Sequence, residues 1–310
     1  MVQVTTKRNF RLQIADCRFL FRLCVFVSLW LLLTPICNAG TVVFMSDFGD
    51  TDDSVAICKG VMLGIDPDLR IIDLTHKVTP FSILDAARFL AGTTPYYPGE
   101  TIFLAVVDPG VGSSRKPLVV KSKRNQYFVL PDNGLVTMVE SQDGIEAIRE
   151  IKNTGWMIGK GLSSTFHGRD IFAPVAARLA KGEDWTDVGP LYMEIVRLTI
   201  PAVRSGERGI SGQIIGFDGP YGNLITNISV EEFSKLHYQP GERIQTRIGE
   251  RDFEIPFVKT FSDVSLHDPL LYIDSRGRLA LALNQDSFAT KYKIMPPLPI
   301  FVARKAQAKQ

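Results

Sequence analysis

Cysteine is scarce in this chain, with four among 310 residues. Three of them, Cys17, Cys24 and Cys37, lie in residues 1–39, which leaves Cys58 as the only thiol of the remaining sequence. A body with a single cysteine cannot form an internal disulfide, which excludes the class of small disulfide-stabilised domains. Cys58 falls in a helical pattern, where we expect it to act as a small apolar side chain.

The chain also has no large net charge of either sign. The chain has 35 Lys and Arg against 33 Asp and Glu, and residues 1–39 contain five of those basic side chains and one acid. The rest is therefore mildly acidic and lacks the basic footprint of a nucleic-acid-binding protein. A composition with 45% hydrophobic and 22% charged residues is globular. The length suits one large domain or two ordinary ones.

Long uncharged runs are confined to the N-terminus. Residues 23–36 (LCVFVSLWLLLTPI) follow a basic stretch that ends at Arg22, and residues 37–39 are suited to a cleavage site. This order is typical of a signal peptide, and the run is shorter than the about 20 residues of a membrane-spanning helix. We predict export after cleavage at Ala39, to the periplasm of a bacterium. Without cleavage, residues 23–36 would be a membrane anchor.

From residue 40 to about residue 196, short apolar runs alternate with helical patterns. The runs that predict strands are 41–45, 70–74, 101–107, 118–120 and 127–130, and those that predict helices are 54–65, 83–91, 135–140 and 171–179. Such alternation indicates an α/β domain, an α/β/α sandwich around a largely parallel sheet. In these sheets ligands bind at the carboxyl ends of the strands.

The pattern changes in the last third of the chain. Short strand-like runs separated by turns lie at 210–217, 224–228, 243–248, 270–273, 279–283 and 292–294. They predict a smaller all-β, barrel-like domain. We place the domains at 40–196 and 209–310, with a linker at 197–208 that contains Pro201, Ser205 and Gly206.

An acidic loop follows the first predicted strand and contains Asp47, Asp50, Asp52 and Asp53. Carboxylates at a strand's carboxyl end can bind a divalent metal or accept hydrogen bonds from a ribose diol. Those directly before a helix can equally cap its free N–H groups. Asp47 lies at the strand end itself and is the better candidate for a functional role.

Two further polar segments could carry chemistry. Residues 108–115 (DPGVGSSR) follow the third predicted strand, and residues 165–170 (TFHGRD) precede a helix. By itself the first is an ordinary turn with a surface Arg115, and His167 in the second could be structural, exposed or a catalytic base. Spacing alone does not decide among these roles.

Six motifs in fixed order carry a resemblance: SDFGDTDDSVAICKG, VDPGVGSSR, PDNGL, TFHGRDIFAP, GPYGNLITNI and DSRGRL. Together they resemble the S-adenosylmethionine hydroxide adenosyltransferase family, the SAM hydrolases, whose relatives are fluorinating and chlorinating adenosyltransferases. The resemblance runs from about Thr41 to Leu298. It implies an N-terminal α/β/α domain, a C-terminal β-barrel, and a homotrimer with the substrate at the subunit interfaces.

The resemblance also implies a reaction, the attack of water or hydroxide on the ribose 5′ carbon of S-adenosylmethionine, which releases adenosine and methionine. S-adenosylmethionine is then the substrate, and neither a cofactor nor a metal is implied. The sequence resembles the family's catalytic trio at Asp108, Arg115 and His167. We hypothesise that Asp108 and His167 orient or deprotonate the water, while Arg115 stabilises developing hydroxide character. The halogenating relatives lack this trio, which favours hydrolysis.

The substrate-binding residues also follow from the resemblance. Asp47 is expected on the ribose hydroxyls, Asn223 at the adenine edge and Phe261 stacked on the base. The expected set at the methionine end is Asp52, Asp218, Ser275 and Arg276. Phe81 is expected in a cavity wall, although plain core packing is an alternative for both phenylalanines. Gly168 stands where the halogenating relatives have a halide-contacting serine.

Two alternatives stay open from the sequence. The first motif alone, with DTDD before Ser54, also resembles the Ca-dependent nucleoside hydrolases, which cleave the N-glycosidic bond. The predicted export suggests instead a module that binds a nucleoside or S-adenosylmethionine without turnover, because fold alone does not determine function.

Overall fold

The computed structural model describes residues 40–159 and 161–305. The predicted export segment, residues 1–39, lies outside the described residues. Within the described part of the chain, no helix is long and apolar enough to cross a membrane.

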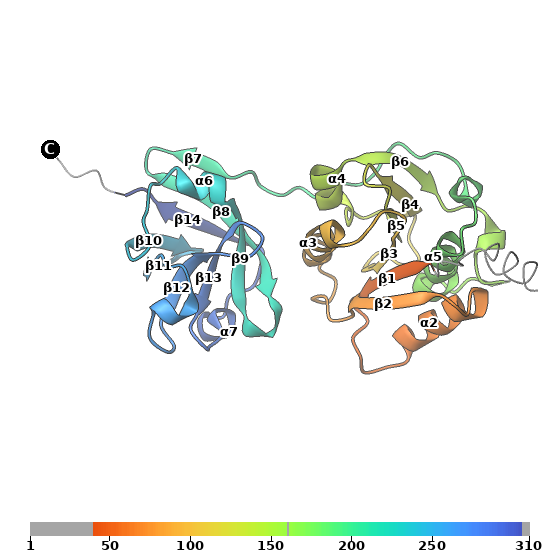
Figure 1. Ribbon diagram of the computed structural model, residues 1–310, viewed down its shortest axis with the longest axis horizontal. Helices are drawn as coiled ribbons and strands as arrows, with labels where there is room; N and C mark the ends of the chain where they lie inside the picture. Colours follow the sequence, from red (N-terminus) through yellow and green to blue (C-terminus); the bar gives the residue numbers. More distant parts are fainter. Residues whose placement is uncertain (1–39, 160, 306–310) are drawn as a thin grey trace, which may run out of the picture. The chain divides into compact units, whose positions relative to one another are not determined.

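A mixed six-stranded sheet forms the N-terminal domain, in the order β2-β1-β3-β5-β4-β6 (Figure 1). Its strands are β1 (Thr41–Ser46), β2 (Arg70–Thr75), β3 (Ile102–Val106), β4 (Pro117–Ser122), β5 (Tyr127–Pro131) and β6 (Ile145–Glu150). Its helices are α2 (Ser54–Ile65), α3 (Ile83–Thr93), α4 (Thr137–Asp143), α5 (Ala173–Ala180) and the π-helix η3 (Gly168–Phe172).

Helices cover both faces of this sheet, as the alternation along β1 shows. Val42 and Phe44 pack in one core cluster with residues of α2 and α5, whereas Val43 and Met45 pack in a second cluster with residues of α3 and α4. Because successive side chains of a strand point to opposite faces, a strand buried on both sides is apolar throughout. The predicted α/β/α layers are therefore confirmed.

The sheet is less parallel than predicted. The pairs β1–β2, β1–β3 and β3–β5 are parallel, but β4 pairs antiparallel with both β5 and β6. Only residues 123–126 separate β4 from β5, and so short a connection can join only antiparallel strands. Strand β6 is half-exposed, which explains why an apolar pattern did not predict it.

The C-terminal domain is an eight-stranded antiparallel sheet in the order β11-β10-β14-β8-β9-β13-β12, with β7 paired to β8. An isolated bridge between Phe257 and Leu271 joins its two edges, so the sheet is nearly closed and the predicted barrel-like domain is confirmed. The strands are β7 (Arg204–Gly206), β8 (Gly209–Asp218), β9 (Asn223–Ser229), β10 (Arg243–Ile248), β11 (Arg251–Pro256), β12 (Pro269–Ile273), β13 (Arg278–Leu283) and β14 (Leu298–Ala303).

One predicted strand of this domain is wrong. Residues 292–294 form the end of helix α7 (Phe288–Tyr292) and the left-handed residue Lys293, at φ 51°. Ser287 accepts a hydrogen bond from the Thr290 N–H and so begins this helix. The last strand is β14, which the sequence pattern missed because proline weakens a strand signal and Pro299 lies inside it.

Candidate active site

The carboxyl ends of β1 and β3 bring two aspartates to one edge of the first sheet. Asp47 directly follows β1 and Asp108 lies two residues beyond β3, and these strands are parallel neighbours. His167 begins the π-helix η3 nearby, a helix type that is frequent at functional sites. A cavity of about 110 Å³, called the trio cavity, is lined by Asp47, Phe48, Phe81, Val106, Asp108, Val111, Thr165, Phe166, His167 and Gly168.

The predicted trio is in direct contact, and two of its members, Asp108 and His167, line this cavity. Arg115 donates from Nε to Asp108 Oδ1 at 3.0 Å and from Nη2 to Asp108 Oδ2, and Nη2 lies 2.7 Å from Nδ1 of His167. The side chains of Asp108 and Arg115 are only 5% and 9% exposed. Two-point pairing of a guanidinium with a carboxylate fixes both groups in orientation as well as in charge.

The contact with Arg115 determines which nitrogen of His167 carries the proton. A guanidinium has only N–H donors, so Nδ1 of His167 must accept, and the proton of the neutral ring lies on Nε2. The Nδ1 lone pair is therefore occupied and cannot take a proton from water. In this arrangement His167 acts through an N–H donor at Nε2, and Asp108 is the available acceptor.

We expect His167 to titrate below its ordinary value. Burial and then the neighbouring Arg115 guanidinium lower the pKa of His167 from 6.5. As the pH drops, the ring takes up its proton in the unfolded chain before it does so in the folded chain. The free energy of unfolding therefore falls as the pH drops from about 6.5 through the pKa of the folded chain, and His167 does not change it above about pH 6.5. An NMR titration of the His167 Cε1–H should give a midpoint below 6.5, and Arg115→Met should raise it. A midpoint at or above 6.5 in the native chain would contradict this assignment.

Two glycines allow the loops of the trio cavity to pack closely. Gly112 has φ +79°, and a Cβ there would lie 2.4 Å from the carbonyl oxygen of Ser164. The loop that carries Arg115 therefore rests on the backbone just before His167. A Cβ at Gly168 would lie 3.0 Å from the ring of Phe48, so a side chain at this position would displace that ring.

Asp47 is held by backbone groups of a neighbouring loop. Its Oδ2 accepts a hydrogen bond from the Phe81 N–H at 2.9 Å, and Phe81 is left-handed, at φ 65°. The Phe81 side chain is 73% exposed at the cavity, so plain core packing does not account for it. Ser46, the residue before Asp47, has its Oγ 2.8 Å from Nδ1 of His76. The backbone carbonyl oxygen of His76 accepts a hydrogen bond from the Gly49 N–H at 2.7 Å.

The other carboxylates of the acidic loop point to separate partners. Asp50 pairs with Lys77 at 2.7 Å. Asp52 Oδ1 accepts from the N–H of Ser54, the first residue of α2, at 3.0 Å, whereas the N-cap residue Asp53 makes no side-chain capping bond. Asp52 does not line the trio cavity. Among residues 40–159 and 161–305, no three His, Cys, Asp or Glu side chains are grouped as a metal site.

A second cavity, called the barrel cavity, has a volume of about 750 Å³. Asp218 at the end of β8, Asn223 at the start of β9 and Phe261 line it, so three predicted binding residues meet in this place. Its other lining residues are Pro220, Tyr221, Leu283, Asn284, Gln285, Asp286 and Ser287. Phe261 also packs on Tyr272 with ring centroids 5.1 Å apart, so core packing remains part of its role.

The sequence interpretation missed Tyr272 and most of the barrel cavity. Burial, then Asp218, raises the pKa of Tyr272. Tyr272 was hidden in an apolar strand pattern, and residues 284–287 form a turn without a chemical signature. Tyr221 carried a usable signal, because it lies inside the motif GPYGNLITNI.

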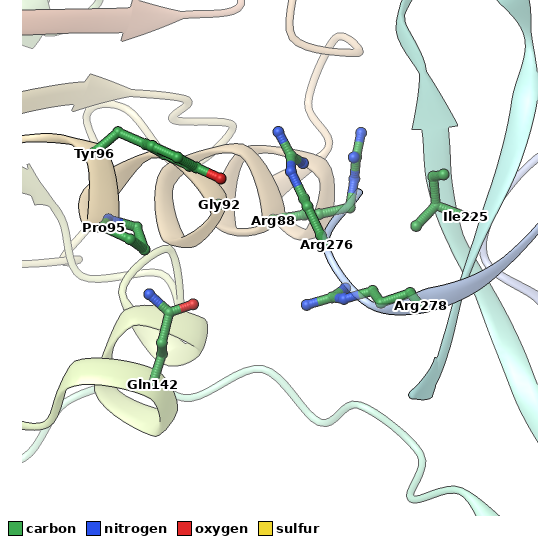
Figure 2. A pocket seen from close by; sticks show the side chains of 8 residues that line it. All are labelled: Arg88, Gly92, Pro95, Tyr96, Gln142, Ile225, Arg276 and Arg278. Atoms are coloured by element: carbon green, nitrogen blue, oxygen red, sulfur yellow. The ribbon is translucent and has the colours of Figure 1, made fainter. Parts of the chain in front are cut away.

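Ser275 and Arg276 lie elsewhere in the fold. They occupy the turn between β12 and β13, where Asp274 Oδ1 accepts the N–H of Arg276 at 2.9 Å. Arg276 lines a third cavity with Arg88 and Arg278 (Figure 2). Within one chain, the structure therefore brings Asp52, Ser275 and Arg276 neither to the trio cavity nor to the barrel cavity.

Comparisons with known proteins agree over both domains. The profile of the SAM hydroxide adenosyltransferase N-terminal domain matches residues 42–189, and that of the C-terminal domain matches residues 212–300. An (R)-S-adenosyl-L-methionine hydrolase of Salinispora tropica is 37% identical over 82% of this chain and 94% of its own. A fluorinase of an Actinoplanes species is 34% identical over 85% and 97%. A crystal structure of an uncharacterized conserved protein from Thermotoga maritima superposes with a TM-score of 0.80, at 36% identity, over 85% of this chain and 100% of its own.

The prediction of export is overturned by these comparisons. The hydrolase relatives, which include proteins of Thermus thermophilus and Methanocaldococcus jannaschii, do not support export. The prediction depended entirely on residues 1–39, which lie outside the described residues, and an apolar run after a basic stretch is a weak signal by itself. We therefore withdraw both the periplasmic location and the anchor at residues 23–36.

Two consecutive domain profiles and relatives above 30% identity across most of the chain leave the family in no doubt. The names of the relatives divide between a hydrolase and a fluorinase, so they agree on an enzyme but differ in the reaction. The chain belongs to the SAM hydroxide adenosyltransferase family.

Proposed function

We propose that this enzyme hydrolyses S-adenosyl-L-methionine to adenosine and L-methionine, by in-line attack of water on the ribose C5′. The observation that carries the proposal is the direct contact among Asp108, Arg115 and His167 beside Asp47. The name of the Salinispora hydrolase, at 37% identity, supports it. No cofactor is part of the proposal, because S-adenosylmethionine supplies its own leaving group.

The proposal gives each member of the trio a separate task. The leaving thioether is neutral and needs no acid, so catalysis depends on the nucleophile and its alignment. Asp108 accepts the water's proton, because each carboxylate oxygen retains a lone pair beyond its bond to Arg115. Arg115 stabilises the developing hydroxide, and the Nε2–H of His167 orients the water oxygen.

The substrate needs more room than the trio cavity provides. That cavity measures about 110 Å³, whereas pockets for ligands of this size measure roughly 300–1,000 Å³. The barrel cavity, at about 750 Å³, carries the residues expected at the base and shares no lining residue with the trio cavity. We propose that the trio cavity of one subunit and the barrel cavity of another complete the site in a homotrimer.

We also propose that each chain consists of two domains, residues 40–196 and 209–310, joined by a linker at residues 197–208.

The product distribution tests the reaction. The purified full chain is incubated with S-adenosylmethionine, with and without chloride or fluoride, and with and without EDTA, and the products are separated chromatographically. We expect adenosine and methionine in equal amounts, independent of halide and of EDTA. Free adenine would point instead to a nucleoside hydrolase, and binding without product would contradict turnover altogether.

Halide transfer is the second candidate, because the Actinoplanes relative is named a fluorinase. Two features of this chain weigh against it. The trio is intact, and Gly168 stands where the resemblance places a halide-contacting serine. A Cβ at this position would lie 3.0 Å from the ring of Phe48, so a serine there would require that ring to shift by a few tenths of an ångström. Formation of a 5′-halogenated nucleoside in the presence of chloride or fluoride would nevertheless show that the enzyme transfers halide.

Mixing two inactive variants tests whether the site is shared between subunits. Asp108→Asn damages the trio cavity and Asn223→Ala the barrel cavity. In co-expressed mixed trimers, roughly a quarter of the interfaces would pair an intact trio cavity with an intact barrel cavity, since each half is intact in half of the subunits. We expect about that fraction of the native turnover. If both cavities of one chain formed the site, no mixture would recover activity.

A further inference from the structure

The motif PDNGL, residues 131–135, has no task in the proposed reaction, yet it lies at the edge of the sheet where the trio forms. Strand β5, which ends at Pro131, lies between β3 and β4 in the first sheet (Figure 1). It runs parallel to β3 and antiparallel to β4. The carboxyl end of β5 therefore meets the carboxyl end of β3, which Asp108 follows, and the amino end of β4, which Arg115 precedes.

The side chain of Asn133 holds the peptide group that leads into Asp108. Its Nδ2 donates a hydrogen bond to the backbone carbonyl oxygen of Val107 at 2.9 Å. A carbonyl oxygen can only accept, so the amide nitrogen, and not the amide oxygen, must face it. Because a peptide group is planar, fixing the Val107 carbonyl also fixes the plane that contains the Asp108 nitrogen and Cα. The bond therefore limits the direction in which the Asp108 side chain leaves the backbone.

The preceding residue of the same turn holds the chain beside Arg115. The backbone N–H of Asp132 donates to the carbonyl oxygen of Lys116 at 2.8 Å. Two consecutive residues, Asp132 and Asn133, thus each form a hydrogen bond to one of the two segments that carry Asp108 and Arg115. A bond to each segment fixes the separation of their backbones, and the two-point pairing of Asp108 with Arg115 depends on that separation.

The turn is itself anchored to a third segment. Asp132 is 7% exposed, and its Oδ1 accepts from the Val196 N–H at 2.8 Å while its Oδ2 accepts from the Tyr192 hydroxyl at 3.3 Å. Asn133 differs, because among the described residues its buried Oδ1 has no hydrogen-bond partner. A buried polar atom without a partner costs stability. Stability alone therefore does not explain an amide at this position.

We propose that Asn133 is a positioning residue for the trio, whose carboxamide aligns the Asp108–Arg115 pair toward His167. This role rests on the proposed hydrolysis, in which Asp108 accepts the proton of the water. Asn133 does not line the trio cavity, so it acts through Asp108. A misplacement of a catalytic group by about 1 Å can lower a rate by roughly 10²-fold, so a bond behind the site can control the reaction.

Replacement of the amide by an apolar group of similar size tests this role. Asn133→Leu removes the donor to Val107 together with the unpaired oxygen. We expect kcat for S-adenosylmethionine hydrolysis to fall by roughly 10- to 100-fold, the effect of a small misplacement of Asp108. KM should change by only a few-fold, because the residues expected on the substrate are unchanged. Initial rates over a range of substrate concentrations separate the two constants.

The titration of His167 reports the same alignment without turnover. Burial and then the Arg115 guanidinium lower the pKa of His167, and Asp108 and Asp170 oppose them to a smaller extent. Loosening of the Asp108–Arg115 pair in Asn133→Leu should weaken both leading effects. The NMR midpoint of the His167 Cε1–H should therefore rise toward 6.5 in this variant. An asparagine with a merely structural role would leave the midpoint where it is in the native chain.

Asn153→Leu is the matched control. The Nδ2 of Asn153 also donates to a backbone carbonyl oxygen, that of Asp187, at 2.9 Å, and Asn153 is half-buried, as Asn133 is. Asn153 lies after β6 and does not line the trio cavity. We expect the native kcat and the native His167 midpoint in this control. Equal losses of kcat in the two variants, or a native kcat and midpoint in Asn133→Leu, would overturn the positioning role.

Further outcomes separate this role from the reaction itself. A rise in KM at unchanged kcat would overturn the role, because it would place the amide at the substrate. Should Asn133→Leu fail to fold by circular dichroism, Asn133→Ala removes the same donor without adding bulk and is measured by both readouts. If the native chain shows no turnover, the proposed hydrolysis fails, and the His167 midpoint alone then decides whether Asn133 aligns the pair.

Discussion

Asp108→Asn is expected to lower kcat for S-adenosylmethionine hydrolysis by roughly 10²–10⁴-fold, the range for loss of a general base. The amide retains the shape of the carboxylate and can still accept a hydrogen bond from Arg115, but it cannot take a proton from water. KM should change by only a few-fold, because Asp108 acts on the water and not on the substrate. Initial rates over a range of substrate concentrations separate the two constants.

A matched control distinguishes this loss from damage to the fold. The side chain of Asp143 is 6% exposed, against 5% for Asp108, and it lines neither the trio cavity nor the barrel cavity. Asp143→Asn therefore also removes a buried carboxylate, which accepts from Thr94 Oγ1 at 2.8 Å. Its kcat should stay within a few-fold of the native value. An equal loss in both variants would show that Asp108 is structural.

Phe103→Ala is expected to lower the free energy of unfolding by about 3–5 kcal/mol, because truncation would leave a cavity in the centre of the first sheet. Phe103 is 0% exposed and stacks on Phe128, with ring centroids 5.1 Å apart and planes at 9°. The expected loss is a large part of a typical total stability of roughly 5–15 kcal/mol. Urea unfolding followed by far-UV circular dichroism measures the difference.

Phe81→Ala provides the comparison, because it removes the same phenyl group from a position that is 73% exposed. We expect it to change the free energy of unfolding by less than about 0.5 kcal/mol. Its effect should appear in KM, since Phe81 lines the trio cavity. If Phe81→Ala destabilised the chain as much as Phe103→Ala does, its side chain would have a packing role that the exposure denies.

The trio illustrates what a motif can predict. Asp108, Arg115 and His167 were expected together from their motifs, and Asp108 follows β3, which pairs in parallel with β1. The tautomer of His167 was not predictable, because it depends on a 2.7 Å contact between residues 52 positions apart. The sequence interpretation left open whether His167 deprotonates or orients the water. The contact with Arg115 favours orientation, which is the role we propose.

Arg276 shows what a motif leaves open. Its motif DSRGRL indicates the methionine end of the substrate, which stays a prediction, and within one chain its guanidinium rests on Gly92 of α3. A turn sequence predicts where the chain reverses, because Asp274 and Gly277 act on near neighbours. It does not predict which distant helix packs against the turn.

Periodicity and motifs were sufficient to predict the family, the two layers of helices, the barrel-like second domain and the members of the trio. Such patterns record each residue's relation to its neighbours along the chain, and these features depend on little else. The antiparallel pairing of β4, the proton position on His167 and the division of the predicted binding residues among three cavities emerged only in three dimensions. They depend on contacts between distant segments, whose geometry is set by packing of the whole chain and not by any local pattern.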